Sequence, residues 1–145
     1  MYFPYLRGRQ FELIALRELV ERKKIGQNII PIIEPIKPSA TLLKTLECFV
    51  KYDREIAVVF NPAVGDFSKK IREMRREDSK IANELYELLT KHDRIIKSYI
   101  MNDKIASKLK CVEFKKEKLI INLNRDCLDD FLEAYEDMFP RYTLI

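Results

Sequence analysis

The chain has 145 residues, which is the usual size of one domain and long enough to bury a hydrophobic core. Its charged share of 34% is high for a soluble domain, while the net charge of +4 permits nucleic-acid binding without requiring it. No apolar run reaches the ~18 residues that a membrane span needs, and the first residues are unlike a signal peptide, so we expect a cytoplasmic protein with no membrane contact.

The first elements in the chain are a short aromatic strand at 2–6, a basic turn at 7–10 and an amphipathic helix that continues to about residue 24. The apolar side chains that share one face of this helix are Leu13, Ala15, Leu16, Leu19 and Val20. Glu12 points into the middle of that face, where a carboxylate is costly unless it is paired. Glu12 either stabilises the positive end of the helix dipole and reaches solvent, or pairs with Arg7 or Arg9 in a polar pocket.

The rest of the chain repeats the alternation of strand and helix. Apolar runs predict strands that are buried on both faces, and leucines at helical spacing predict the helices between them. The expected strands are 29–33, 56–60, either 95–96 or 98–101, 118–123 and the start of another at 142–145. The expected helices are 39–50 with Ser39 as N-cap, a helical region at 68–89 in two parts, a basic one at 68–76 and one with an apolar stripe from 78, a short helix at 105–109, and a last helix that Asp126 caps.

Alternation with short connections indicates an α/β domain with a parallel sheet and right-handed crossovers. Two architectures fit. One is an open, flavodoxin-like doubly wound sheet, and the other is a partial or truncated (β/α)-barrel, since a closed barrel needs about 250 residues. The chain ends within a strand, which favours the barrel. No Gly/Ser linker interrupts residues 1–145, so we expect a single domain that is either the N-terminal part of a longer barrel or a shortened relative.

Polar residues follow each expected strand, and in both architectures the carboxyl ends of parallel strands form the ligand-binding face. Glu12 and Glu34 are the candidates for acid/base chemistry there. The candidates for binding an anionic ligand are Arg7, Arg9, Lys37, Asn61, Asn124 and Arg125. Asp66 follows the third strand and belongs to the same group. The alternative is that these residues only cap helices and shape loops, because such loops are polar in most proteins.

The cysteines and the single histidine exclude several kinds of site. Cys48, Cys111 and Cys127 lie far apart without a CxxC motif, which indicates reduced thiols. His92 is interpreted as a polar residue at a helix end. The sequence contains no Walker loop, GxGxxG, GxSxG or HExxH motif, so we predict no metal site, and the sequence identifies no cofactor.

A second charged feature is the run from residue 69 to 78. It contains Lys69, Lys70, Arg72, Arg75 and Arg76. Such a run is most often a solvated helix face. The alternative is an electrostatic contact with nucleic acid or with an acidic partner, although few aromatic residues are interleaved for base stacking.

The pattern Tyr2-x-Pro4-Tyr5-Leu6-Arg7-x-Arg9-Gln10-x-Glu12-x-x-Ala15-Leu16 resembles the start of the bacteriophage-type "beta protein" family and its uncharacterised bacterial relatives. Pro31-Ile32-Ile33-Glu34-Pro35 and Asn61-Pro62-x-x-Gly65 are similar to the next two strand ends of that family. The match covers roughly the first 66 residues. The resemblance implies a (β/α)-barrel about twice this length in a mobile-element or phage-defence setting. It assigns no catalytic residue.

Three functions remain open at this point. The first is an accessory protein that acts with a partner in such a setting. The second is an enzyme that acts on an anionic small molecule or nucleic acid at the strand ends, and the sequence does not decide whether the protein is an enzyme. The third is a domain that self-associates through an open sheet edge.

Overall fold

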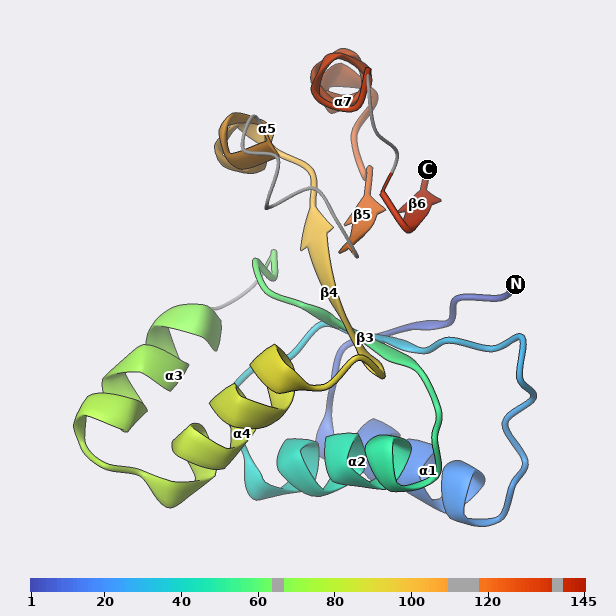
Figure 1. Ribbon diagram of the computed structural model, residues 1–145, viewed down its shortest axis with the longest axis vertical. Helices are drawn as coiled ribbons and strands as arrows, with labels where there is room; N and C mark the ends of the chain where they lie inside the picture. Colours follow the sequence, from blue (N-terminus) through green and yellow to red (C-terminus); the bar gives the residue numbers. More distant parts are fainter. Residues whose placement is uncertain (64–66, 110–117, 137–139) are drawn as a thin grey trace. The chain divides into compact units, whose positions relative to one another are not determined.

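The computed structural model describes residues 1–63, 67–109, 118–136 and 140–145, and it alternates strands with helices along the chain (Figure 1). Contacts within the chain divide it into two compact units, Met1–Ile96 and Lys97–Ile145, which we call the N-terminal unit and the C-terminal unit. In each unit neighbouring strands run parallel. The predicted α/β class with alternating strand-helix units is therefore confirmed.

The N-terminal unit carries its strands in chain order. Its elements are β1 (Tyr5–Leu6), α1 (Gln10–Glu21), β2 (Ile32–Ile33), α2 (Ala40–Lys51), β3 (Ile56–Val59), α3 (Phe67–Arg76) and α4 (Lys80–Lys91). β1 pairs with β2 and β2 pairs with β3. Consecutive pairing is the arrangement in a (β/α)-barrel, whereas a flavodoxin-like sheet places its first strand between the second and the third. The pairing thus favours the partial barrel.

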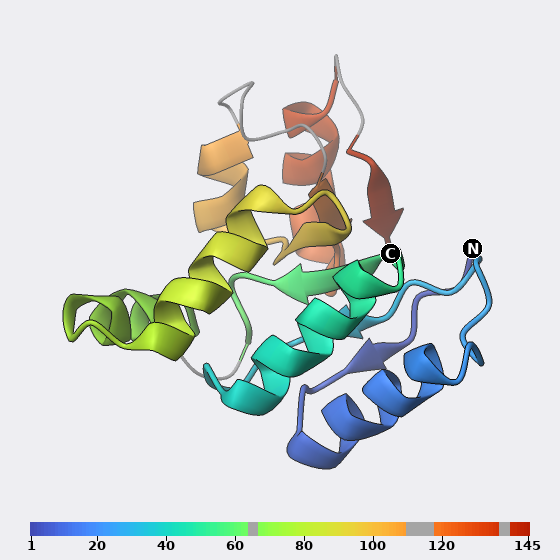
Figure 2. The same ribbon diagram turned by 60° about the horizontal axis from the view of Figure 1, so that its bottom comes forward.

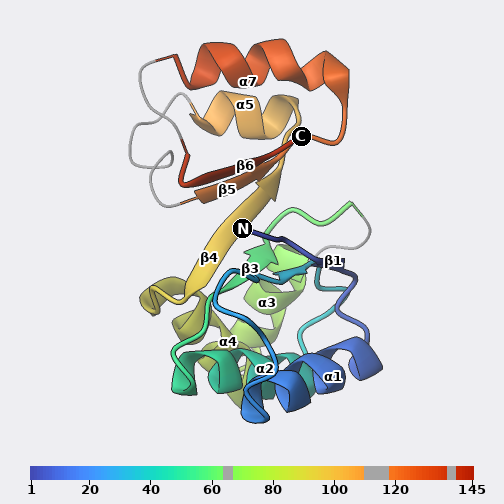
Figure 3. The same ribbon diagram turned by 90° about the vertical axis from the view of Figure 1, so that its right-hand side faces the viewer.

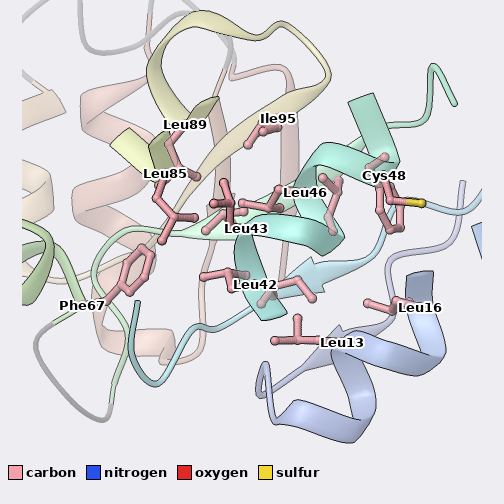
Figure 4. Close-up of a cluster of buried hydrophobic side chains, with 14 of the residues drawn as sticks. Leu13, Leu16, Leu42, Leu43, Leu46, Cys48, Phe67, Leu85, Leu89 and Ile95 are labelled. Carbon is pink, nitrogen blue, oxygen red and sulfur yellow. The ribbon is translucent and has the colours of Figure 1, made fainter. Parts of the chain in front are cut away.

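The helices of the N-terminal unit pack side by side against its strands. α1 contacts α2, α2 contacts α4, and α4 contacts α3 (Figures 2 and 3). The core beneath them is built from leucines on the inward helix faces, which meet Phe67 and Ile95 (Figure 4). Every residue of β2 and β3 is buried, so the predicted burial of these apolar runs on both faces is confirmed. Ala15 and Leu19, which we expected on the buried face of α1, are exposed instead.

Several predicted boundaries were wrong for local reasons. β1 and β2 are shorter than 2–6 and 29–33, and only an isolated bridge joins Tyr2 to Ile29. The Ile30 and Ile32 N–H groups donate to the Tyr2 and Pro4 carbonyls at 2.9 and 2.8 Å, but Pro4 has no N–H to donate in return, so the ladder is interrupted before Tyr5. The helical region at 68–89 consists of the two helices α3 and α4. The break lies at Asp78, whose φ of 56° is left-handed and cannot continue a helix.

The C-terminal unit is smaller. Its elements are β4 (Ile95–Ile100), which begins in the last residues of the N-terminal unit, α5 (Asp103–Leu109), β5 (Lys118–Ile121), the 3-10 helix η1 (Arg125–Cys127), α7 (Leu128–Ala134) and β6 (Tyr142–Leu144). β4 pairs with β5 and β5 with β6. A core of Met101, Ile105, Ile120, Phe131 and Tyr135 lies between strands and helices.

Two further predictions for the C-terminal unit need correction. The fourth strand was expected within 94–101, either at 95–96 or at 98–101, whereas β4 runs continuously from Ile95 to Ile100 and ends before Met101. Asp126 does not cap the last helix, because it lies within η1 and Cys127 occupies the N-cap position of α7. Among the described residues no helix is both long and apolar enough to cross a membrane.

Candidate functional site

Glu34 is a buried carboxylate at the end of β2, and it joins the ends of β1, β2 and β3. Its side chain is only 5% exposed. Oε2 accepts a hydrogen bond from the Tyr5 hydroxyl at 3.0 Å, and Oε1 accepts one from the Ala63 N–H at 2.6 Å. The Glu34 N–H donates to the Leu6 carbonyl at 2.8 Å. We call Glu34, Tyr5, the Ala63 N–H and the neighbouring Arg7 the strand-end site.

The chain turns sharply after β1 and passes directly over Glu34. Gly8 has a φ of 64°, and a Cβ at this position would lie 2.9 Å from Ile33 Cγ2 and 3.2 Å from the Glu34 carbonyl oxygen. Only glycine combines that left-handed backbone with such a close approach. The turn therefore brings Arg7 to the strand-end site.

The electrostatics of the site act on the Tyr5 hydroxyl. Burial raises the pKa of Tyr5 above its ordinary value, and the hydrogen bond to Glu34 and the charge of that carboxylate raise it further. The positive charge of Arg7 opposes the shift. Tyr5 is consequently a neutral donor at physiological pH, and Arg7 lies within electrostatic range of it.

Glu12 does not form the pocket ion pair that we considered. Its Oε2 accepts a hydrogen bond from the backbone N–H of Arg9 at 2.8 Å, and the side chain is half-buried in the first turn of α1. A carboxylate in this position satisfies an N–H that the helix leaves without a partner. Among the described residues no ion pair joins Glu12 to Arg7 or Arg9, so Glu12 has a capping role.

The other predicted ligand-binding residues of the N-terminal unit are exposed or half-buried. Arg7, Arg9 and Lys37 are exposed in the N-terminal unit, and Asn61 is half-buried after β3. Lys37 lines a groove of about 350 Å³ with Pro38, Lys70, Glu73, Met74 and Glu77. Asp66 lies outside the described residues.

Asn124 and Arg125 belong to the C-terminal unit. Asn124 Nδ2 donates to Asp126 Oδ2 at 3.1 Å, and its Oδ1 accepts from the Asp126 N–H at 3.2 Å. These bonds hold the turn after β5, which is the loop role that we left open for this residue. Arg125 begins η1, and its side chain lies outside the described part of the chain.

The predicted basic run forms α3, which presents its cations to solvent. Lys69, Lys70, Arg72, Arg75 and Arg76 are exposed, whereas Phe67 and Ile71 are buried and fix the helix to the core. The Arg75 guanidinium carbon lies 3.7 Å from the centroid of the Tyr86 ring, and its Nε–H donates to Asn83 Oδ1 at 3.3 Å.

Within the described residues, the cysteine thiols and the histidine do not contribute to the strand-end site. Cys48 is buried and Cys127 is half-buried, both as free thiols, while Cys111 lies outside the described ranges. His92 stands at the C-cap of α4, as expected for a polar helix end. No group of three or more potential metal ligands occurs among the residues that the structure describes.

Sequence reasoning missed Tyr5 and the Ala63 N–H as partners of Glu34. Tyr5 is identified only from the register of β1 and β2, which places it opposite Ile32, two residues before Glu34. The Ala63 bond has no sequence signal, since any residue except proline supplies an N–H. Comparisons with family models, curated proteins and solved structures found no match.

Proposed function

We propose that this protein is an accessory protein that binds nucleic acid through α3. The observation that carries the proposal is the row of exposed cations on a helix that Phe67 and Ile71 anchor to the core. An anchored helix holds its charges at fixed spacing, which suits a regular row of phosphates. The resemblance to the "beta protein" family suggests a mobile-element or phage-defence setting, in which the protein acts with a partner.

The distribution of charge supports the same conclusion. Residues 1–96 contain 18 Lys and Arg against 14 Asp and Glu, whereas residues 97–145 contain 9 of each. The whole net charge of +4 therefore belongs to the N-terminal unit, which carries α3. A positive field attracts a polyanion and speeds its association.

The experiment is fluorescence anisotropy with a labelled DNA duplex across a salt series. The double variant Arg72→Glu, Arg76→Glu should abolish binding that the wild-type protein shows at low salt. The control Lys44→Glu, Lys51→Glu changes net charge equally on exposed positions of α2 and should retain most of the affinity. A wild-type protein that binds no duplex at low salt would contradict the proposal.

The second candidate function is acid/base chemistry on an anionic substrate at the strand-end site. It is supported by the 3.0 Å contact between the buried Glu34 carboxylate and the Tyr5 hydroxyl, with the Arg7 cation nearby. Arg7 would hold the anion, and Glu34 would accept a proton through Tyr5. Hydrolysis of a model phosphodiester should then fall about 100-fold or more in Glu34→Gln and Tyr5→Phe, because each variant removes a group that takes part in the proton transfer. Equal rates in the wild type and Glu34→Gln would remove this candidate.

Self-association through an open sheet edge stays a prediction. Within the described residues of the N-terminal unit β1 pairs only with β2, which leaves its other edge for a second copy. Measuring mass in solution over a range of protein concentrations tests this, and a monomer at the highest concentration would argue against it.

A further inference from the structure

Three of the cations of α3 share one side of the helix. Lys69, Arg72 and Arg76 are spaced i, i+3 and i+7, so they form one stripe along the helix axis. Phe67 and Ile71 face the core. We call Lys69, Arg72 and Arg76 the cationic stripe.

The side of α3 next to the stripe is mixed in charge, and its Glu73 borders Lys69. Lys70, Glu73 and Glu77 all line the groove that also contains Lys37. Lysines and glutamates that share one groove largely cancel each other's field. This flank therefore offers a polyanion much less attraction than the cationic stripe does.

Neighbouring groups hold part of the stripe in place. The Arg72 Nε–H donates to the Ser68 carbonyl at 3.2 Å, which orders the guanidinium before any ligand binds. Lys69 Nζ lies 3.9 Å from Glu73 Oε1, but both side chains are more than half exposed. Such an exposed pair contributes little, so Lys69 can exchange this partner for a phosphate.

The spacing of the stripe fits one strand of a duplex. Seven residues of helix separate Lys69 from Arg76, which is about 10 Å of axis. A helix that lies parallel to the axis of B-form DNA spans about three phosphates of each strand over that length. Arg75 covers one face of the Tyr86 ring, so this ring is engaged in the protein rather than arranged as a platform for stacked bases.

We propose that Lys69, Arg72 and Arg76 contact successive phosphates of one strand of a nucleic-acid duplex, without reading its bases. This inference rests on the proposed function and specifies the flank, the form of nucleic acid and the number of contacts. An acidic protein is the competing partner. It would need no regular phosphate spacing and would not prefer a duplex to another polyanion.

The test measures duplex affinity against salt for the variants Lys69→Gln, Arg72→Gln and Arg76→Gln, with Lys70→Gln as the matched control on the other flank. Each stripe variant should lose about eightfold in affinity at about 0.1 M salt and reduce the salt slope by about 0.9. Lys70→Gln should change affinity less than about twofold. Scrambling the duplex sequence should have no effect.

The outcomes separate this inference from the function on which it rests. A protein that binds duplex, but loses as much in Lys70→Gln as in the stripe variants, would overturn the stripe and leave nucleic-acid binding intact. Tighter binding to single strands than to duplex would overturn the duplex assignment. Equal competition by polyglutamate would favour the acidic partner. Absence of any nucleic-acid binding would overturn both proposals.

Discussion

The two units differ in how they treat the polar side chains that they bury. In the N-terminal unit Glu34 bonds to Tyr5 and Ala63, and the Thr45 hydroxyl donates to the Leu13 carbonyl at 3.1 Å. Among the described residues of this unit, Arg54 Nε is the one buried side-chain polar atom without a hydrogen-bond partner. In the C-terminal unit Ser98 Oγ and both amide atoms of Asn122 are buried and have no hydrogen-bond partner within the described structure. An unpaired buried polar group costs about 1–3 kcal/mol. The N-terminal unit should therefore be the more stable of the two.

The lengths of the helices point in the same direction. α1, α2 and α4 have 12 residues each, whereas α5 and α7 have 7 each. Long amphipathic helices bury more apolar surface, and this burial is the main source of helix stability in proteins. Stability and positive charge thus coincide in the unit that carries the proposed nucleic-acid interface.

The largest expected effect comes from truncating one buried phenylalanine in the core of each unit. Phe49 is fully buried in the N-terminal unit, and Phe131 is 5% exposed in the C-terminal unit. Phe49→Ala should cost about 3–5 kcal/mol because it removes apolar contacts and leaves a cavity in a close-packed core. Phe131→Ala should cost less, because its surroundings are smaller and can collapse. Amide hydrogen exchange followed separately in each unit measures both values.

The same two variants can also show that the two units do not differ in stability. Leu132→Ala is the control for the C-terminal unit, since Leu132 is 57% exposed and its truncation should change stability little. Equal loss of protection throughout the chain in Phe49→Ala and Phe131→Ala would mean that the units unfold as one. There would then be no difference in stability between the N-terminal unit and the C-terminal unit.

The next effect concerns the Glu34 carboxylate. Glu34→Ala leaves the Tyr5 hydroxyl and the Ala63 N–H without their acceptor and should cost about 1–3 kcal/mol. Tyr5→Phe removes only one of the two bonds and should cost about 0.5–1.5 kcal/mol. Denaturant unfolding measures both. A larger cost in Tyr5→Phe than in Glu34→Ala would show that the carboxylate does not hold the strand ends.

A pH titration compares the two units through one tyrosine in each of them. The pKa of Tyr5 is raised, so its contribution to stability is present below about pH 10 and is lost as the pH rises through the raised pKa. Glu34→Gln should lower the pKa of Tyr5, though not to its ordinary value, because burial remains. Burial alone raises the pKa of Tyr135 in the C-terminal unit to about 12, and this value should not move. Tyrosine NMR signals against pH report both groups.

Local patterns predicted most strands and helices of the fold, though not all of their bounds. The apolar runs predicted β2 and β3. Ser39 caps α2 as expected, since its Oγ accepts a hydrogen bond from the Leu42 N–H at 3.2 Å. Both features depend on residues close together in the chain. The helical region at 68–89 was divided between residues 76 and 78, close to the break, but the left-handed backbone of Asp78 was not predicted, because such a residue inside a charged run has no distinct sequence signal.

The candidate site was harder to predict because it depends on register. Glu34 was selected as a strand-end carboxylate, but its partner Tyr5 lies 29 residues away and is identified only once β1 and β2 are aligned. Glu12 was chosen for the same chemistry. It caps the first turn of α1 instead, through a hydrogen bond from the backbone N–H of Arg9, three residues before it. Sequence spacing thus located a polar strand end without showing which of its groups meet.

The smallest expected effect gives the most direct test. Removing one buried hydroxyl should change the free energy of unfolding in opposite directions in the two units. Ser98→Ala removes a buried hydroxyl that has no partner in the described structure and should stabilise the protein by about 1 kcal/mol. Thr45→Val removes a hydroxyl that bonds to the carbonyls of Leu13 and Thr41, and should destabilise it by about 1 kcal/mol.

Chemical unfolding of the two variants beside the wild type, with hydrogen exchange to locate each change, measures both signs. Val is close to Thr in volume, and Ala fills most of the space of Ser, so neither variant adds a large cavity. A loss of stability in Ser98→Ala would mean that its hydroxyl is satisfied in solution, and the supposed weakness of the C-terminal unit would lose its main support. A gain there with a loss in Thr45→Val would place the difference between the units in hydrogen bonding rather than in size, since the two deletions remove the same chemical group.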